Sequence, residues 1–225
     1  MKKSARKIRG CAWNINGWKW DINRRKPKRN KIRSEIERYD IVTLTETHMN
    51  KEEIEEFEKT IGKDYNCYHS INTSKKNRAG VTIMIKNNIF EDRQIKKVEI
   101  DPRGGRWIII TVAYEDGEDR NFCAFYAPNK ASERIKWLQA WSKKTKQLTG
   151  RVVMNGDFNF VMDTDLDKIG GRKNSGTLGK KVQDKWERKR GWIDVWRAQN
   201  PEMIATTCTS RHPTNKVKTR IDNTR

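Results

Sequence analysis

The 225-residue sequence lacks any long apolar run, which excludes a membrane-spanning helix. No uninterrupted apolar segment approaches the about 20 residues that a helix needs to cross a bilayer. A secretory signal is also missing, because Met1-Lys2-Lys3 leads into a strand-like segment and not into an apolar stretch. We therefore expect an intracellular protein without a membrane partner, and its basic amino terminus favours the nucleus.

The sequence has few cysteines, and no two of them form a Cys-x-x-Cys pair. The four are Cys11, Cys67, Cys123 and Cys208. Their wide spacing argues against a zinc knuckle and favours a reducing compartment with free thiols. Repeats, low-complexity tracts and Pro/Gly-rich linkers are also missing, so we expect one domain over residues 1–225.

Acidic residues are scarce relative to basic ones, and this imbalance is the strongest compositional feature. Lys and Arg number 49 against 29 Asp and Glu, which gives a formal net charge of +20. Such a charge implies attraction to a polyanion, most simply nucleic acid, although anionic membranes would also attract it. Two basic runs, residues 24–29 and 172–190, are candidates for contacts with a phosphate backbone.

The apolar residues are only 34% of the chain, but they gather in short runs that predict strands alternating with helices. Asp116-Gly117 between two strands predicts a hairpin, so much of the pairing should be antiparallel or mixed. These elements predict an α/β fold with two sheets flanked by helices. The expected strands cover residues 8–16, 40–46, 81–85, 107–114, 121–126 and 152–157, and the expected helices cover 28–38, 51–61, 132–148 and 178–189. Ser132 is the expected cap of the third helix, with Ile135, Leu138 and Trp141 as its apolar stripe.

Several of the expected strands end in carboxylate or amide side chains. These residues are Asn14, Asn16, Glu46, Asp157, Asn159 and, near the carboxyl terminus, Asp222, while Tyr126 ends a further strand and precedes Ala127-Pro128-Asn129. Carboxylate and amide oxygens suit Mg²⁺ or Mn²⁺. In so basic a protein, acidic strand ends are better explained by a metal site than by solubility. A metal beside a phosphate path is an arrangement that cleaves phosphodiesters.

The order of the motifs adds a specific resemblance, to the endonuclease/exonuclease/phosphatase superfamily. That superfamily includes the apurinic/apyrimidinic endonucleases and the endonuclease domains of LINE-type non-LTR retrotransposons. The motifs that carry the resemblance are Trp13-Asn14-Ile15-Asn16-Gly17, Leu44-Thr45-Glu46-Thr47-His48, Tyr126-Ala127-Pro128-Asn129, Gly156-Asp157-Phe158-Asn159, Trp192-Ile193-Asp194 and Arg220-Ile221-Asp222. Each is weak alone, whereas six in order are specific.

The resemblance implies a four-layer α/β-sandwich with the site at one mouth of the two sheets. It implies that Asn14 and Glu46 hold the metal and that Asn129 supports the substrate phosphate. It implies four catalytic residues. Tyr126 would contact the scissile phosphate, and Asp157 would position or activate the nucleophilic water. Asn159 would steady the phosphate or the metal-bound oxygen, and Asp222 would orient a histidine.

The sequence departs from the family pattern after Asp222. The family carries a last strand with Ser-Asp-His, and none of His48, His69 and His212 stands in that context. We therefore expect a truncated domain in which the last strand is missing and a sheet edge is left unpaired.

The sequence thus predicts a metal-dependent DNA endonuclease of the retroelement type, once followed by a reverse transcriptase in its parent element. Two alternatives stay open: a catalytically silent remnant that only binds nucleic acid, and a phosphatase of the same fold.

Overall fold

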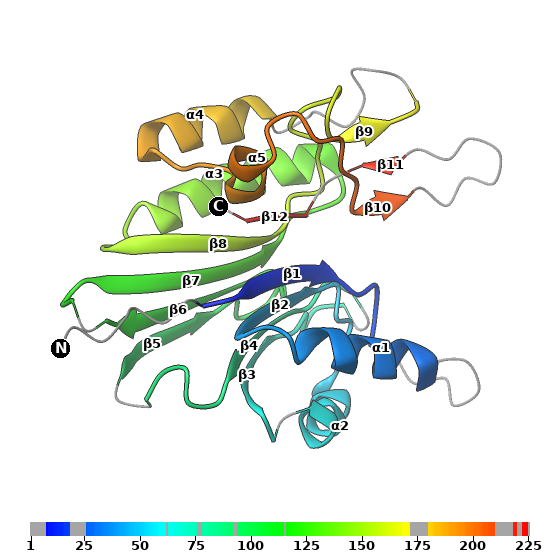
Figure 1. Ribbon diagram of the computed structural model, residues 1–225, viewed down its shortest axis with the longest axis vertical. Helices are drawn as coiled ribbons and strands as arrows, with labels where there is room; N and C mark the ends of the chain where they lie inside the picture. Colours follow the sequence, from blue (N-terminus) through cyan, green and yellow to red (C-terminus); the bar gives the residue numbers. More distant parts are fainter. Residues whose placement is uncertain are drawn as a thin grey trace.

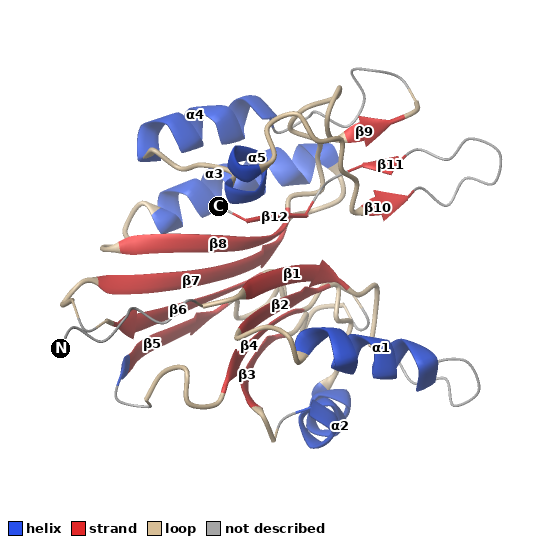
Figure 2. Ribbon diagram, viewed as in Figure 1, coloured by secondary structure: helices blue, strands red, loops and turns tan. Residues whose placement is uncertain are grey.

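Two β-sheets face each other in the computed structural model, with helices on the outer face of each (Figure 1; Figure 2). The structure describes residues 8–18, 26–61, 63–75, 78–91, 94–114, 116–171, 180–209, 218–219 and 222–224. None of the helices within these ranges combines the length and the apolar character needed to cross a bilayer.

The first sheet has four strands in the order β1-β2-β4-β3. They are β1 (Gly10–Asn14), β2 (Ile41–Thr45), β3 (Tyr65–Ser70) and β4 (Val81–Lys86). β1 and β2 are parallel, and the other two pairings are antiparallel. The helices on the outer face of this sheet are α1 (Lys26–Ile36) and α2 (Lys51–Ile61).

The second sheet has five strands in the order β12-β8-β7-β6-β5. They are β5 (Ile95–Ile100), β6 (Trp107–Ala113), β7 (Asp119–Tyr126), β8 (Arg151–Asp157) and β12 (Asp222–Thr224). Here β7 and β8 are the parallel pair, and every other pairing is antiparallel. The helices on this side are α3 (Ala131–Thr145), α4 (Lys180–Arg190) and α5 (Val195–Gln199), and a small third sheet joins β9 (Lys168–Ile169), β10 (Cys208–Thr209) and β11 (Lys218–Thr219).

Successive residues of the central strands pack into different cores, which defines the four layers. Ile83 of β4 and Ile108 of β6 belong to the core between the two sheets, whereas their neighbours Met84 and Ile109 face the helices. Met84 packs with residues of α1 and α2, and Ile109 packs with residues of α3. Strands that are apolar on both faces are typical of sheets covered on both sides. The predicted four-layer α/β-sandwich is therefore confirmed.

The expected elements are present, with boundaries that move by a few residues. The Asp116-Gly117 hairpin joins β6 to β7 as predicted. The expected cap at Ser132 is wrong, because α3 begins at Ala131 and its N-cap, Lys130, makes no side-chain cap hydrogen bond. The expected unpaired sheet edge stays a prediction: β12, which carries Asp222, is the outermost strand of the second sheet and pairs antiparallel with β8 over three residues. Residues 24–25 and 172–179 of the basic runs lie outside the described ranges.

Gly156 allows β8 to approach β7 closely, and this contact generates a stability prediction. A Cβ atom at Gly156 would lie 2.1 Å from the Phe125 carbonyl oxygen. We expect Gly156→Ala to lower the free energy of unfolding by about 1–3 kcal/mol, because the strands must separate to admit the methyl group. The measurement is the urea midpoint at unchanged m-value.

The matched control for this variant is Gly10→Ala in β1. Its Cβ would meet only the Ile41 carbonyl oxygen, at 3.7 Å, which is an ordinary contact. We expect the control to change the free energy of unfolding by less than about 0.5 kcal/mol. Equal midpoints for the two variants would contradict the close approach.

Candidate active site

The two parallel strand pairs place their carboxyl ends at one rim of the sandwich. In the first sheet Asn14, the last residue of β1, is the register partner of Thr45, and Glu46 follows directly. In the second sheet Tyr126 and Asp157, the last residues of β7 and β8, are partners of each other. Side chains delivered by parallel strands at their carboxyl ends meet where α/β folds keep their ligands.

Two side-chain hydrogen bonds join the sheets at this rim. Asn14 Nδ2 donates to Asp157 Oδ2 at 2.9 Å, and the Tyr126 hydroxyl lies 2.5 Å from Glu46 Oε1. Both bonds connect residues more than 75 positions apart in the chain, at separations of 143 and 80 residues. The predicted metal-binding and catalytic residues of the two sheets are therefore in direct contact.

The asparagines complete one continuous hydrogen-bond chain from Asn14 to Glu46. The Asn159 N–H donates to Asp157 Oδ1 at 2.8 Å, and Asn159 Nδ2 donates to Asn129 Oδ1 at 3.1 Å. Asn129 Oδ1 lies in turn 2.5 Å from the Tyr126 hydroxyl. Six of the seven predicted site residues thus form a single polar network, which we call the mouth network: Asn14, Asp157, Asn159, Asn129, Tyr126 and Glu46.

The Tyr126 hydroxyl is the branch point of the mouth network. It has one proton and two acceptors, Glu46 and Asn129, at equal distance. Burial raises the pKa of the phenol well above its ordinary value, and the hydrogen bond to Glu46 raises it further. Tyr126 therefore stays neutral at physiological pH and keeps a proton to donate to an incoming anionic oxygen.

Backbone strain is concentrated at the same rim. Non-glycine residues with positive φ include Asn16 at 48°, Glu46 at 51°, His48 at 54° and Asn159 at 55°. Such conformations cost about 1–3 kcal/mol each, and they gather where a site needs a side chain aimed in an otherwise unfavourable direction. At Glu46 the left-handed backbone directs the carboxylate across the rim to Tyr126.

His48 lies beside this carboxylate and not in the network itself. Its Nε2 is 3.7 Å from Glu46 Oε2. A Cβ atom at Gly17 would come 3.2 Å from His48 Nδ1, so a larger residue there would press on the ring. His48 is therefore placed to orient Glu46.

Two arginines, the buried Arg134 and the half-buried Arg106, brace the segment that carries Tyr126 and Asn129. Arg134 of α3 donates from Nη1 to the carbonyls of Pro128 and Asn129, at 3.2 and 2.7 Å. Arg106 donates to the Tyr126 carbonyl at 3.1 Å, and its guanidinium lies over the Tyr126 ring at 5.3 Å from the centroid. Burial lowers the pKa of both guanidinium groups from the ordinary value for arginine.

The donor set at the rim fits a hard divalent cation. Cations such as Mg²⁺ keep several waters and take only one or two carboxylates from the protein. Glu46 supplies a carboxylate that is 16% exposed, and Asn14 Oδ1 accepts from the Asn16 N–H with a second lone pair to spare. No cluster of three His, Cys, Asp or Glu side chains occurs in the described ranges, so a cage built wholly from protein ligands is not formed there.

Asp222 is the seventh predicted site residue, and only its backbone is placed. The register of β12 sets it opposite Asp157, while its side chain lies outside the part of the chain that is described. Trp18, considered for base stacking, is instead buried in the core of the first sheet at 2% exposure. Trp20 lies outside the described ranges.

Sequence reasoning missed Arg134, although a signal was present. The buried face of α3 consists of Arg134, Leu138, Trp141 and Thr145, and Arg134 is only 4% exposed. A charged residue in register with an apolar helical stripe indicates a buried partner, here two carbonyl groups of the turn before the helix.

The fold and the mouth network define an α/β-sandwich with a polar site at the carboxyl ends of its parallel strands. A family model described as the Endonuclease/Exonuclease/phosphatase family matches residues 11–222. The chain belongs to this family.

Similar proteins include one curated sequence and two solved structures. The chain is 25% identical over 145 residues to the transposon TX1 uncharacterized 149 kDa protein of Xenopus laevis, a match that covers 64% of this chain and 11% of that protein. The Xenopus laevis APE2 catalytic domain superposes with a TM-score of 0.70 at 17% identity, covering 96% of this chain and 81% of that one. The AP endonuclease LMAP from Leishmania major gives 0.76 at 16% identity, with 96% and 78% covered. Because both structures are below 25% identity to this chain, the superpositions show a shared fold.

The contacts of Arg134 generate a prediction. Arg134→Met should lower the free energy of unfolding by about 2–3 kcal/mol, because it leaves the Pro128 and Asn129 carbonyls without their charged donor. Lys136→Met, an exposed position on the same helix, should change it by less than about 0.5 kcal/mol. Arg134→Lys should recover part of the loss. Thermal and urea unfolding measure all three, and a Met variant as stable as its control would refute the bracing role.

Proposed function

We propose that this chain is a metal-dependent endonuclease that hydrolyses phosphodiester bonds in DNA and nicks one strand. The observation that carries the proposal is the mouth network, which joins a carboxylate and an asparagine from each sheet to a neutral tyrosine. Family membership and the net charge of +20 support it. The charge favours a polyanionic substrate over a small phosphorylated molecule.

Asp157 is suited to orient and deprotonate the attacking water. It is 0% exposed, and its two oxygens accept from Asn14 Nδ2 and the Asn159 N–H. These donors fix the carboxylate plane, so a water bound to it would have a defined direction of attack.

Tyr126 and Asn129 are suited to hold the phosphate. The phenol keeps its proton because burial raises its pKa, and that proton can turn from Glu46 or Asn129 to a phosphate oxygen. Donors placed before the reaction stabilise the negative charge that develops on the phosphate. Asn159 keeps Asn129 in place through its Nδ2 group, which also donates to the Ala127 carbonyl at 2.7 Å.

Mg²⁺ or Mn²⁺ is the cofactor that the donor set fits best, held by Glu46 and the Asn14 amide oxygen. A bound cation of this kind supplies charge that stabilises the transition state of phosphodiester hydrolysis. Glu46 and Asn14 would hold the cation, and Tyr126 would keep its proton for an oxygen of the substrate.

The retroelement type is the finer part of the proposal. It is supported by the likeness to the transposon TX1 protein of Xenopus laevis, of whose length this chain spans only 11%. We propose a nuclear site of action and a reverse transcriptase in the same parent element.

The test is nicking of supercoiled plasmid by the purified chain, in Mg²⁺ and then in EDTA. Asp157→Asn, which keeps the shape of the side chain, should lower the rate at least about 100-fold, because the water loses its base. Asp116→Asn, an exposed residue in the hairpin at the opposite end of β7, should leave the rate unchanged. Nicking that survives Asp157→Asn would overturn the proposal.

The competing possibility is a chain that binds nucleic acid without cutting it, because a net charge of +20 gives affinity for a polyanion without requiring any chemistry. It predicts no nicking with any divalent metal, together with DNA affinity that falls steeply with salt. The plasmid assay separates the two possibilities directly.

A further inference from the structure

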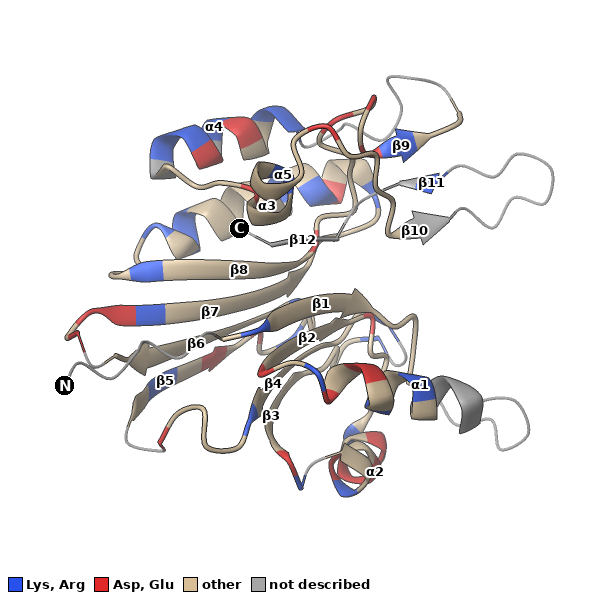
Figure 3. Cartoon of the chain, in the orientation of Figure 1, with Lys and Arg blue, Asp and Glu red and all other residues tan. Residues whose placement is uncertain are grey.

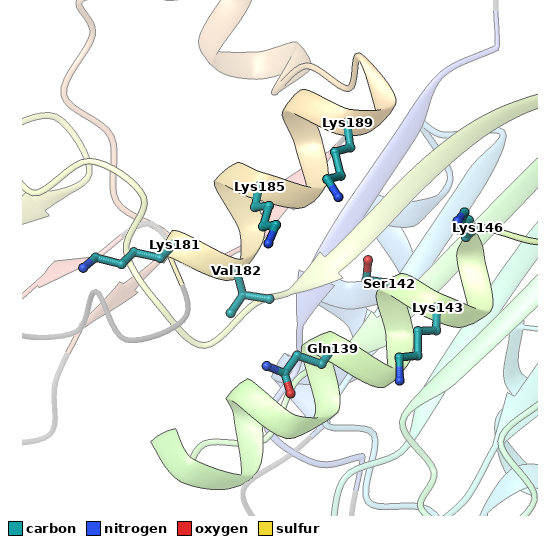
Figure 4. Close-up of a pocket in the computed structure, with 8 residues that line it drawn as sticks. All are labelled: Gln139, Ser142, Lys143, Lys146, Lys181, Val182, Lys185 and Lys189. Carbon is teal, nitrogen blue, oxygen red and sulfur yellow. The ribbon is translucent and has the colours of Figure 1, made fainter.

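A basic cleft lies between α3 and α4, on the outer helical layer of the second sheet (Figure 4). Its volume is about 920 Å³. The residues that line it are Gln139, Ser142, Lys143 and Lys146 from α3 and its C-cap, and Lys181, Val182, Lys185 and Lys189 from α4. Five of these eight residues are lysines and none is acidic, so we call it the lysine cleft.

The lysines of α4 form a row along one wall. Lys181, Lys185 and Lys189 are spaced four residues apart, which places them on one face of the helix at intervals of about 6 Å. Lys143 and Lys146 stand on the α3 side, and all five lysines are exposed. Figure 3 shows Lys and Arg recurring along both helices.

Ion pairs within the part of the chain that the structure describes do not neutralise the row. None of the five lysines has an ion pair with any carboxylate that the structure describes, whereas the neighbouring Lys144 is paired with Glu99 at 3.0 Å. Like charges four residues apart destabilise a helix by a few tenths of a kcal/mol per pair. This cost is offset when an anion occupies the cleft.

The shape of the cleft selects among anions. A row of cations on two walls matches an extended polyanion better than a single phosphate, which would need lysines converging on one point. A cleft of about 920 Å³ is too small to enclose a duplex. A lipid surface would require a protruding face with exposed apolar side chains. This face is hollow, and Val182 is the one apolar residue among the described residues that line it.

We propose that the lysine cleft binds a single nucleic-acid strand by its phosphate backbone, at a site separate from the mouth network. The side chains that the structure describes in the cleft are basic or polar apart from Val182, so we expect contacts with the phosphate backbone, which do not depend on sequence. Gln139 and Ser142 supply additional hydrogen bonds to the backbone. The inference does not rest on hydrolysis, since binding in the cleft requires neither Asp157 nor a metal.

The experiment measures fluorescence anisotropy of labelled dT30 and rU30 with the full chain in EDTA, which prevents cleavage. The variant is Lys185→Glu with Lys189→Glu. The matched control is Lys59→Glu with Lys63→Glu, two exposed positions in and just after α2 that change the net charge by the same amount. Circular dichroism and the melting temperature verify that both variants are folded.

We expect the cleft variant to bind both oligonucleotides about tenfold more weakly than the control variant at low salt. The slope of log K against log salt should fall by about 1.4, since each lost phosphate contact removes about 0.7 for a single strand. Similar loss with deoxyribose and ribose strands is the signature of backbone contacts.

Three outcomes would overturn the inference. One is equal affinity of the cleft and control variants. Another is a loss seen only with a duplex or only with one sugar. The third is unchanged oligonucleotide binding with lost binding to phosphatidylserine vesicles. Plasmid nicking, measured in parallel, reports on the proposed function separately, because the variant leaves the mouth network intact.

Discussion

The site depends on a constraint of pairing: each sheet contains one parallel pair of strands, and the carboxyl ends of both pairs meet at one rim. Had β1 run antiparallel to β2, Asn14 would lie at the opposite end of the sheet from Glu46. The apolar core between the sheets fixes how the two pairs face each other, with Ile83 and Ile108 among its members. The core therefore sets the separation of the sheets across which the Asn14–Asp157 and Tyr126–Glu46 hydrogen bonds form. This packing, in which Tyr126 itself takes part, therefore positions the functional residues.

Within the rim, the Glu46 carboxylate is available to a metal cation, and the Tyr126 hydroxyl is available to donate to a phosphate. The protein carries a net charge of +20, yet the Glu46 carboxylate is bonded to a phenol and lies beside a histidine. A lysine or arginine paired to it would satisfy the carboxylate permanently and leave no place for a metal. Arg106 and Arg134 instead donate hydrogen bonds to carbonyl groups of the neighbouring turn. The two arginines near the mouth thus hold the turn in place and leave the Glu46 carboxylate available to a metal ion.

The parts that sequence predicted are those that need only local patterns. A polar residue after a buried apolar strand is visible at Asn14, Glu46 and Asp157, and the order of such motifs fixes the family. The edge strands β3 and β5 escaped notice because their sequences mix polar and apolar residues, as edges of sheets commonly do. The hydrogen bonds between the sheets join distant segments, which no local pattern contains, whereas the position of Arg134 in the buried stripe of α3 was a local signal that went unused. Ser132 looked like a cap because its residue type suits one, but the turn braced by Arg134 starts the helix one residue earlier.

Helix α3 connects the two regions and also separates them. Its buried face begins with Arg134, which holds the turn of the mouth network, while its last turn and C-cap carry Lys143 and Lys146 of the lysine cleft. Twelve residues of helical rise put Arg134 and Lys146 about 18 Å apart along the axis. That is more than two Debye lengths at physiological ionic strength, where one is about 8 Å. Charges in the far part of the cleft are therefore screened from the mouth, and a change made there alters how nucleic acid is held without altering the field in which a phosphodiester would react.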